Sequence, residues 1–272
     1  MKLKIAAVLT ALVATASATP KKLTGVYLQW GYNREVYTRS TIRFWKEGEY
    51  DFKVRNVKAH DKPDFDGFVD APMDITIPQN SFRIGLYLNE QKTHAIEINF
   101  DHAKYVVTDG QRIPLSGQIH GNPLPADTVI SFDFLEFEHT NGANFYHINY
   151  VKQSRLWRNK KHMKATALFK IGAGIVVPRT DVHLFGVRKD NKYQVSGYVV
   201  SAEMGTRFYP IKNLFLEANI KTGFAHYLRV RTMDGGLARH GFGYFEVIGL
   251  LGYDILWGKA RHARPAGDTN SP

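Results

Sequence analysis

The C-terminal end of the chain alternates between apolar and polar residues, and this alternation constrains the fold more than any other feature. Between residues 244 and 257 one side of the alternation is apolar apart from Gly249, whereas the other side carries Glu246, Gly252 and Asp254. Two residues is the period of a β-strand, in which successive side chains point to opposite faces. The segment therefore predicts a strand with one face against apolar surroundings and the other against polar ones.

Seven further segments show the same alternation. They are residues 26–33, 82–88, 95–101, 145–155, 165–177, 197–208 and 214–224. The connections between the strands are either short or long. The short ones are 89–93, 156–164 and 210–213, and the long ones are 34–81, 104–144, 178–193 and 229–243. Short turns at one end and long loops at the other are typical of outer-membrane barrels, whose short turns face the periplasm.

We therefore expect an all-β fold, a single antiparallel transmembrane β-barrel of eight strands with short periplasmic turns and long extracellular loops. The two longest loops contain strand-like pieces at 41–45 and 50–57, which predict a hairpin, and at 129–137. We interpret these pieces as strand extensions above the membrane. A ten-stranded barrel is the alternative.

Glycine indicates which face of the strands points inward. In the eight segments nearly all glycines lie on the polar face, and Gly249 is the exception on the apolar face. A solvated face has no reason to collect glycine, which weakens a strand, whereas a narrow lumen needs residues that take little room. The polar face is therefore predicted to line the lumen and the apolar face to meet lipid.

Charged residues on the polar face are balanced in number, which suits a confined interior where unpaired ions are costly. The acidic set is Glu97, Asp101, Glu203, Glu217, Glu246 and Asp254, and the basic set is Arg83, Arg155, Lys170, Arg207, Lys221 and Arg229. Apart from Arg229, which follows the last residue of its segment, these side chains form the predicted lumen charge network. An ordinary solvated surface with ion pairs is the alternative.

The N-terminus predicts export. Lys2 and Lys4 precede an apolar run at 5–13 and small residues at 14–18, which is the pattern of a secretory signal peptide over residues 1–18. The apolar run is far shorter than the roughly 20 residues of a spanning helix. We expect the barrel to occupy residues 19–257 and a polar periplasmic tail to occupy residues 258–272.

Composition limits the partners. The formal net charge of +11 becomes +9 without Lys2 and Lys4, and this basic balance favours anionic surfaces such as lipopolysaccharide phosphates. The chain has no cysteine, so it forms no disulfide or thiolate metal site. We expect a monomer that contacts outer-membrane lipids and lipopolysaccharide and that binds no nucleic acid, metal or cofactor.

The alternating segments, with a terminal strand that ends on the aromatic Trp257, resemble the small outer-membrane β-barrels of Gram-negative bacteria, the OmpA-barrel and OmpX class. The resemblance is one of pattern and covers essentially the whole mature length. It implies an outer-membrane location and recognition of the terminal strand by the barrel assembly machinery. The chain departs from the usual arrangement because fifteen polar residues, 258–272, follow Trp257.

One stretch carries candidate catalytic residues. Glu138, His139 and Thr140 could act as orienting acid, base and nucleophile in ester cleavage. The stretch is loosely similar to the His-x-Ser-Asn run of outer-membrane lipid A deacylases, but the hydroxyl of Thr140 directly follows the histidine, and Asn141 stands where the serine would be. Alternatively, Asn141 and Gly142 form a turn and His139 is a polar loop residue.

The interior of an eight-stranded barrel is just wide enough for side chains to fill, so a balanced ionic lumen indicates a plug. We therefore expect a non-enzymatic outer-membrane protein that serves membrane integrity or surface interaction through its long loops. The alternatives are a lipid A-modifying hydrolase and a narrow channel.

Overall fold

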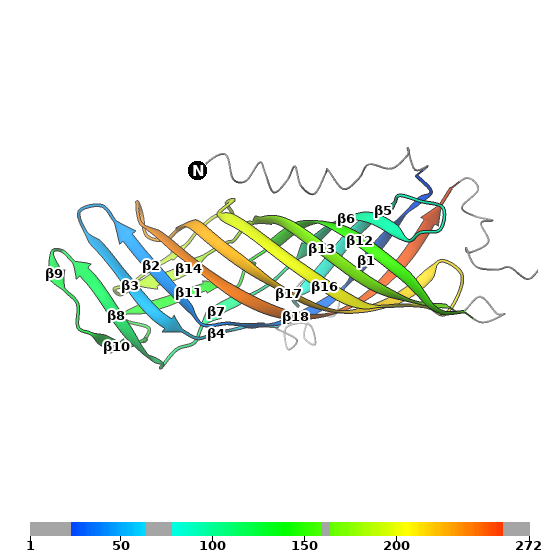
Figure 1. The fold of residues 1–272 in the computed structure, drawn as a ribbon. Coiled ribbons are helices and arrows are strands. Elements are labelled where there is room, and N and C mark those ends of the chain that lie inside the picture. The colour runs from blue at the N-terminus through cyan, green and yellow to red at the C-terminus, as the bar shows by residue number, and fades with distance from the viewer. Residues whose placement is uncertain (1–22, 64–77, 159–163, 258–272) are drawn as a thin grey trace, which may run out of the picture.

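Eight long strands form a closed antiparallel ring in the computed structural model, which describes residues 23–63, 78–158 and 164–257 (Figure 1). The strands are β1 (Gly25–Tyr37), β5 (Asn80–Tyr87), β6 (His94–Asp101), β12 (Phe145–Arg158), β13 (Lys164–Val176), β16 (Gly197–Tyr209), β17 (Leu214–Arg231) and β18 (Leu237–Leu256). Each strand pairs with the next, and β1 pairs with both β5 and β18. The predicted count of eight is confirmed, and the ten-stranded alternative is wrong.

No helix within these ranges is long and apolar enough to cross a membrane. The predicted signal peptide, residues 1–18, and the predicted tail, residues 258–272, lie outside the described residues.

The barrel strands present their apolar faces outward and their polar faces inward, as the glycine argument predicts. Ile98, Ile148 and Leu251 are more than half exposed on the outside, whereas Arg83 and Glu97 are fully buried inside. Outward apolar side chains on all eight strands form a band around the ring, which we call the apolar band. On β18 this band runs from Phe245 to Ile255.

The connections differ in length at the two ends of the barrel. Short turns join β5 to β6 and β16 to β17 at the end where β1 begins and β18 ends (Figure 1). At the opposite end three of the four predicted long loops are present. The fourth, 229–243, is mostly strand, because β17 continues to Arg231 and β18 begins at Leu237. The prediction of a long loop there is wrong.

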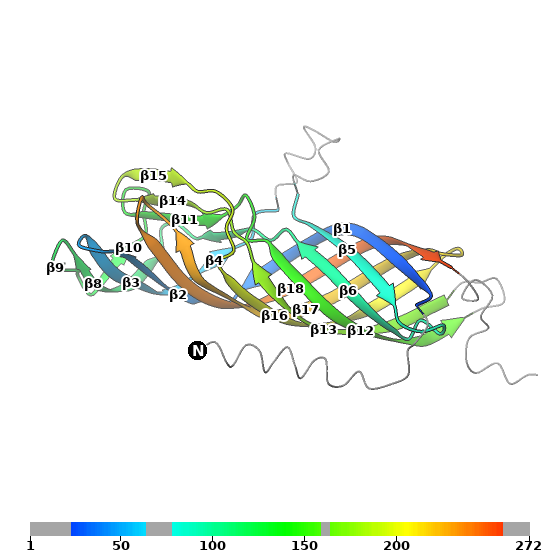
Figure 2. The same ribbon diagram turned by 90° about the horizontal axis from the view of Figure 1, so that it is seen from above.

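The long connections fold into two sheets that extend the barrel (Figure 2). One, the β3 sheet, continues from β18 through β2 (Ser40–Lys46), β3 (Tyr50–Val57) and β8 (Arg112–Ile119), and β8 also pairs with β9 (Asn122–Pro123) and β10 (Asp127–Val129). The other, the β11 sheet, continues from β1 through β4 (Ala59–His60), β7 (Tyr105–Val107), β11 (Leu135–His139), β14 (Asp181–Leu184) and β15 (Val187–Asp190).

The predicted hairpin of residues 41–45 and 50–57 is confirmed as β2 and β3. The segment 129–137, predicted as one extension, is instead divided between the two sheets, because β10 pairs with β8 while β11 pairs with β7 and β14.

An apolar core fills the space between the two sheets. Phe44 of the β3 sheet meets Phe137 of the β11 sheet edge to face, with ring centroids 5.3 Å apart. Further core residues are Ile42, Phe52, Val54, Tyr105, Val107, Leu115, Ile130, Leu135, Val182 and Leu184. In this extension the apolar side chains point inward, as in a two-sheet sandwich. Polarity therefore changes sides between the barrel and the extension.

Strand β18 shows this change within one strand. Its inward face carries Asp254 and Glu246 within the barrel, and then Tyr244 and Phe242, which join the core of the extension. Its outward face is apolar from Ile255 back to Phe245, and nearer the start of the strand, in the extension, it carries the exposed Arg239. One period-two pattern thus serves a barrel and a sandwich in succession.

Gly85 and Gly249 offer a matched test of the assignment of inside and outside. A methyl group at Gly85 would overlap the ring of Tyr27, whose hydroxyl donates to Glu97 Oε2 at 2.7 Å. A methyl group at Gly249 meets nothing within 4 Å. Overpacking costs about 1–3 kcal/mol, so we expect Gly85→Ala to destabilise the barrel by that order in urea unfolding from lipid vesicles. Gly249→Ala should unfold as the wild type does, and equal effects of the two substitutions would contradict the assignment.

Candidate functional site

Ten buried charged side chains form an ionic cluster in the middle of the lumen, and none is more than 3% exposed. The cluster consists of Arg83, Lys170, Arg207, Lys221, Glu97, Asp101, Glu203, Glu217, Glu246 and Asp254. All ten belong to the charge network inferred from the sequence. Beneath the cluster, at the short-turn end, the aromatic side chains of Tyr27, Tyr87, Tyr209 and Phe215 pack together and fill the barrel.

Strand register builds the cluster. Lys170 on β13 lies opposite Glu203 on β16, Glu203 lies opposite Lys221 on β17, and Lys221 lies opposite Glu246 on β18. Four neighbouring strands therefore place charges of alternating sign in one row. Directly opposed unlike charges stabilise a sheet, whereas like charges would destabilise it.

Lys170 is the most connected cation of the cluster. Its Nζ lies 3.1 Å from Glu97 Oε2, 3.1 Å from Glu203 Oε1 and 2.8 Å from Glu217 Oε1. Arg83 Nη1 approaches Glu203 Oε1 at 2.5 Å. A buried ion pair is tolerated only when such contacts compensate the loss of hydration.

Two further cations contact other acids of the cluster. Lys221 pairs with Asp101 and lies 3.4 Å from Glu246 Oε2. Arg207 donates to Glu217 Oε2 at 2.7 Å and to the Tyr87 hydroxyl at 2.9 Å. Its guanidinium also lies 4.1 Å from the centroid of the Phe215 ring, within the range of a cation–π contact.

Two charged residues in the lumen were missed from the sequence. Glu35 is buried on β1 and accepts hydrogen bonds from Asn33 Nδ2 at 2.9 Å and from Gln79 Nε2 at 2.6 Å. It has the inward parity of the segment 26–33 but lies two residues beyond its end, so a longer strand would have included it. Lys92 lies in the turn between β5 and β6, and its Nζ is 2.9 Å from Asp254 Oδ2. Strand alternation gives no information on a residue in a turn.

Arg155 and Arg229 were predicted on the lumen face, and both are exposed. Arg155 lies opposite the inward-facing Thr166 and keeps the predicted parity, but it is exposed near the end of β12, just before a β-bulge between Arg155 and Trp157. Arg229 lies within a second bulge, between Tyr227 and Val230 of β17. A bulge interrupts the simple alternation, so counting by two fails at Arg229. Neither side chain belongs to the buried cluster.

The structure does not bring the candidate catalytic residues together. Thr140 Oγ1 donates to Glu138 Oε1 at 2.6 Å, whereas His139 lies on the opposite, core-facing side of β11. His139 Nδ1 lies 2.9 Å from Thr180 Oγ1, and its Nε2 lies 3.1 Å from His240 Nε2. Burial lowers the pKa of His139 to about 3. A group with that pKa is a poor general base near neutral pH.

Within the described ranges, no group of three or more His, Asp or Glu side chains is arranged to hold a metal ion. No family model and no curated protein matches the chain.

Several solved structures are similar in fold. The outer membrane protein OprG from Pseudomonas aeruginosa is 9% identical with a TM-score of 0.39, and the match covers 88% of this chain and 99% of that one. Neisserial surface protein A is 9% identical with a TM-score of 0.36, and the match covers 86% and 100% of the two chains. The attachment invasion locus protein Ail of Yersinia pestis is 10% identical with a TM-score of 0.31, covering 86% and 99%. The strand pairing establishes the eight-stranded ring independently of these similarities.

Replacement of Lys170 by methionine tests whether the ionic cluster holds the barrel together. The substitution keeps much of the side-chain volume but removes one of the two cations shared by Glu97, Glu203 and Glu217, and Arg83 remains as the other. Breaking a buried pair costs about 3–5 kcal/mol. When samples are heated to increasing temperatures before electrophoresis, we therefore expect the band of the folded protein to disappear at a clearly lower temperature than in the wild type. Arg112→Met is the control, because its pair with Asp127 is exposed and should contribute little. Equal melting of both variants would contradict a structural role for the cluster.

Proposed function

We propose that the chain is a non-enzymatic outer-membrane β-barrel protein of Gram-negative bacteria that displays a folded body at the cell surface. The apolar band around a closed ring supports this location, because a closed barrel satisfies every backbone hydrogen bond within hydrocarbon. Band residues include Phe82, Ile84, Ile98, Ile148, Phe169, Ile171, Val200, Met204, Ile220, Val247 and Leu251. The short turns would then face the periplasm and the extension would face the exterior.

The apolar core of the extension carries the surface role in this proposal. Long loops without a core would present changing shapes, whereas aromatic side chains from both sheets pack between them here. Phe52, for example, lies 5.8 Å from Phe185 and 6.1 Å from Phe134, measured between ring centroids. A packed body beyond the membrane offers a fixed surface to a partner.

The interior supports a plug more than a channel. A water-filled pore would expose the side chains that line it, yet Arg83, Glu97 and Lys221 are 0% exposed to a water-sized probe. The separation of His139 from Thr140 on β11 likewise gives no support to a hydrolase.

A row of like charges on the outer face of the extension supports an anionic partner. Lys53 on β3 lies opposite Arg43 on β2, which lies opposite Arg239 on β18. Directly opposed like charges destabilise a sheet, and the one acidic residue paired with this row is Asp51, 2.6 Å from Arg43. We call these three cations the basic row.

The basic row lies above the apolar band. Six residues separate Arg239 from Phe245, or about 20 Å along the strand. Because barrel strands tilt by about 35–45°, the row stands about 15 Å above the band, at the level of the phosphates and sugars of lipopolysaccharide in an outer membrane. We propose that the basic row binds lipopolysaccharide phosphates, which would tie the extension to the membrane surface.

Single cysteines test the proposed orientation, because the chain has no cysteine of its own. Glu47 lies in the turn between β2 and β3, and Lys212 lies in the short turn between β16 and β17. In intact cells a membrane-impermeant maleimide should label Glu47→Cys but leave Lys212→Cys unlabelled until the outer membrane is disrupted. Labelling of Lys212→Cys alone would show the reverse orientation, and recovery of the protein without membranes would refute the proposal.

The basic row predicts salt-dependent lipopolysaccharide binding. The double substitution Lys53→Gln and Arg239→Gln removes two exposed charges that have no ion pair in the described residues, and the one exposed hydrogen bond lost, from Arg239 Nε to His226 Nε2, should have little effect on folding. We expect this variant to bind vesicles containing lipopolysaccharide more weakly than the wild type, with the difference shrinking as salt screens the charges. Arg112→Gln, in the same sheet but paired with Asp127, is the matched control. Unchanged binding of the double variant would remove lipopolysaccharide as the partner of the row.

A further inference from the structure

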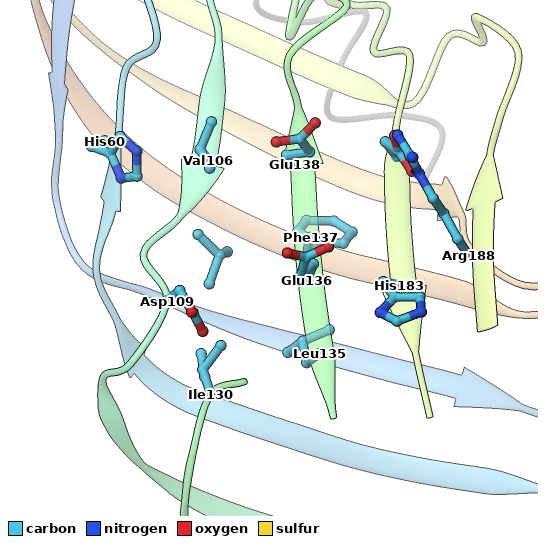
Figure 3. Close-up of a pocket in the computed structure, with 12 residues that line it drawn as sticks. His60, Val106, Asp109, Ile130, Leu135, Glu136, Phe137, Glu138, His183 and Arg188 are labelled. Atoms are coloured by element: carbon cyan, nitrogen blue, oxygen red, sulfur yellow. The ribbon is translucent and has the colours of Figure 1, made fainter. Parts of the chain in front are cut away.

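A cavity of about 330 Å³ opens on the β11 sheet, at the place where β7 and β11 separate (Figure 3). The two strands pair only at Val106 with Glu138 and at Tyr105 with His139. Beyond this point β7 ends, while the outer part of β11, Leu135 to Phe137, pairs with β14 on its other side. The sheet is therefore split at this point, and the cavity lies in the split.

The floor of the cavity is apolar. Val107, Ile130, Leu135 and Phe137 line it, and all four belong to the core of the extension. The cavity thus reaches from the surface to the buried core. Its volume lies at the lower end of the range of small-molecule sites, which are mostly apolar with a few placed polar groups.

The rim of the cavity is acidic. Asp109, Glu136 and Glu138 form no ion pair with any residue in the described ranges, and the fourth acid of the rim, Asp181, pairs with Arg188 at 2.5 Å. Four acids and one arginine leave a formal charge of −3, with both histidines neutral. The whole chain carries +11, so the cavity has the opposite sign to the net charge of the chain.

His183 adds a hydrogen-bond acceptor to this rim. The side chain is 5% exposed, and its Nδ1 lies 2.6 Å from the carbonyl oxygen of Phe132. A carbonyl only accepts, so Nδ1 carries the proton and Nε2 of the neutral ring is an acceptor. Nε2 has no hydrogen-bond partner in the described part of the chain, and Glu136 lies directly opposite His183 on the neighbouring strand. His183 lines the cavity, so a donor that enters the cavity can pair with this nitrogen.

We infer that this cavity binds a small primary amine with an apolar stem. The ammonium group has three N–H donors and no acceptor, which matches a rim of carboxylates and an imidazole nitrogen. It would donate to Glu136, Glu138 and His183 Nε2, while the stem lies in the cavity between β7 and β11, above Leu135 and Phe137. The inference goes beyond the proposed surface role and depends only on the fold of the extension.

The test uses 2-phenylethylamine and its neutral counterpart 2-phenylethanol, titrated against the folded protein in a non-ionic maltoside detergent. Binding is followed by calorimetry or by ligand-observed NMR. We expect the amine to bind and the alcohol to bind at least about tenfold more weakly, because a hydrogen bond between charged groups contributes more than a neutral one. Equal binding of the two compounds, or no binding of the amine beyond its uptake by empty micelles, would overturn the inference.

Variants distinguish the cavity from other binding surfaces. The double variant Glu136→Gln and Glu138→Gln removes two charges but keeps the size and shape of both side chains. It should weaken amine binding by about tenfold or more while leaving the binding of the alcohol unchanged. Glu47→Gln removes an exposed carboxylate from the other sheet and should have no effect. If the double variant retained full amine affinity, the site would lie elsewhere and the inference would be wrong. Failure of the labelling experiment on orientation would leave this test unaffected.

Discussion

Closure of eight strands into a ring leaves an interior that only side chains can fill, and the rest of the molecule follows from this limit. Small residues such as Gly85 make room for large ones such as Tyr27, and charged residues are admitted only where neighbouring strands supply the opposite charge. The row from Lys170 to Glu246 satisfies both conditions at once. Since the inner face is ionic, the outer face is free to be uniformly apolar.

Strand register places different combinations of charges opposite each other on the inner and outer faces of the sheet. Inside the barrel, the row from Lys170 to Glu246 alternates in sign, although Glu246 also lies opposite Glu35 on β1. Outside, the basic row of Lys53, Arg43 and Arg239 opposes like charges, and Asp51 pairs with Arg43. The proposed binding of phosphates would relieve the repulsion within this row.

Period-two alternation was sufficient to predict the ring, its count of strands and ten of its lumen charges, because each depends only on the parity of a residue within one strand. Parity failed at Arg229, which lies within a bulge, whereas Arg155 keeps the predicted parity but is exposed near the end of its strand. It also gave no information on partners: the contact of Lys170 with Glu217, 47 residues apart, depends on strand order and tilt. The core of the extension was missed for a related reason, since an alternating segment looks the same whichever face is buried.

The split between β7 and β11 follows from the change of polarity between barrel and extension. Within the barrel, a gap between strands would expose an ionic lumen to hydrocarbon, and the closed ring prevents it. The extension differs from the barrel on both faces of its sheets, because its interior is apolar and its exterior is water. Its sheets therefore need not close into a ring. A gap there places a cavity above core residues such as Phe137, beside carboxylates that water can solvate. The extension is therefore the part of this molecule where a cavity with both an apolar and a charged wall can exist without cost to the barrel.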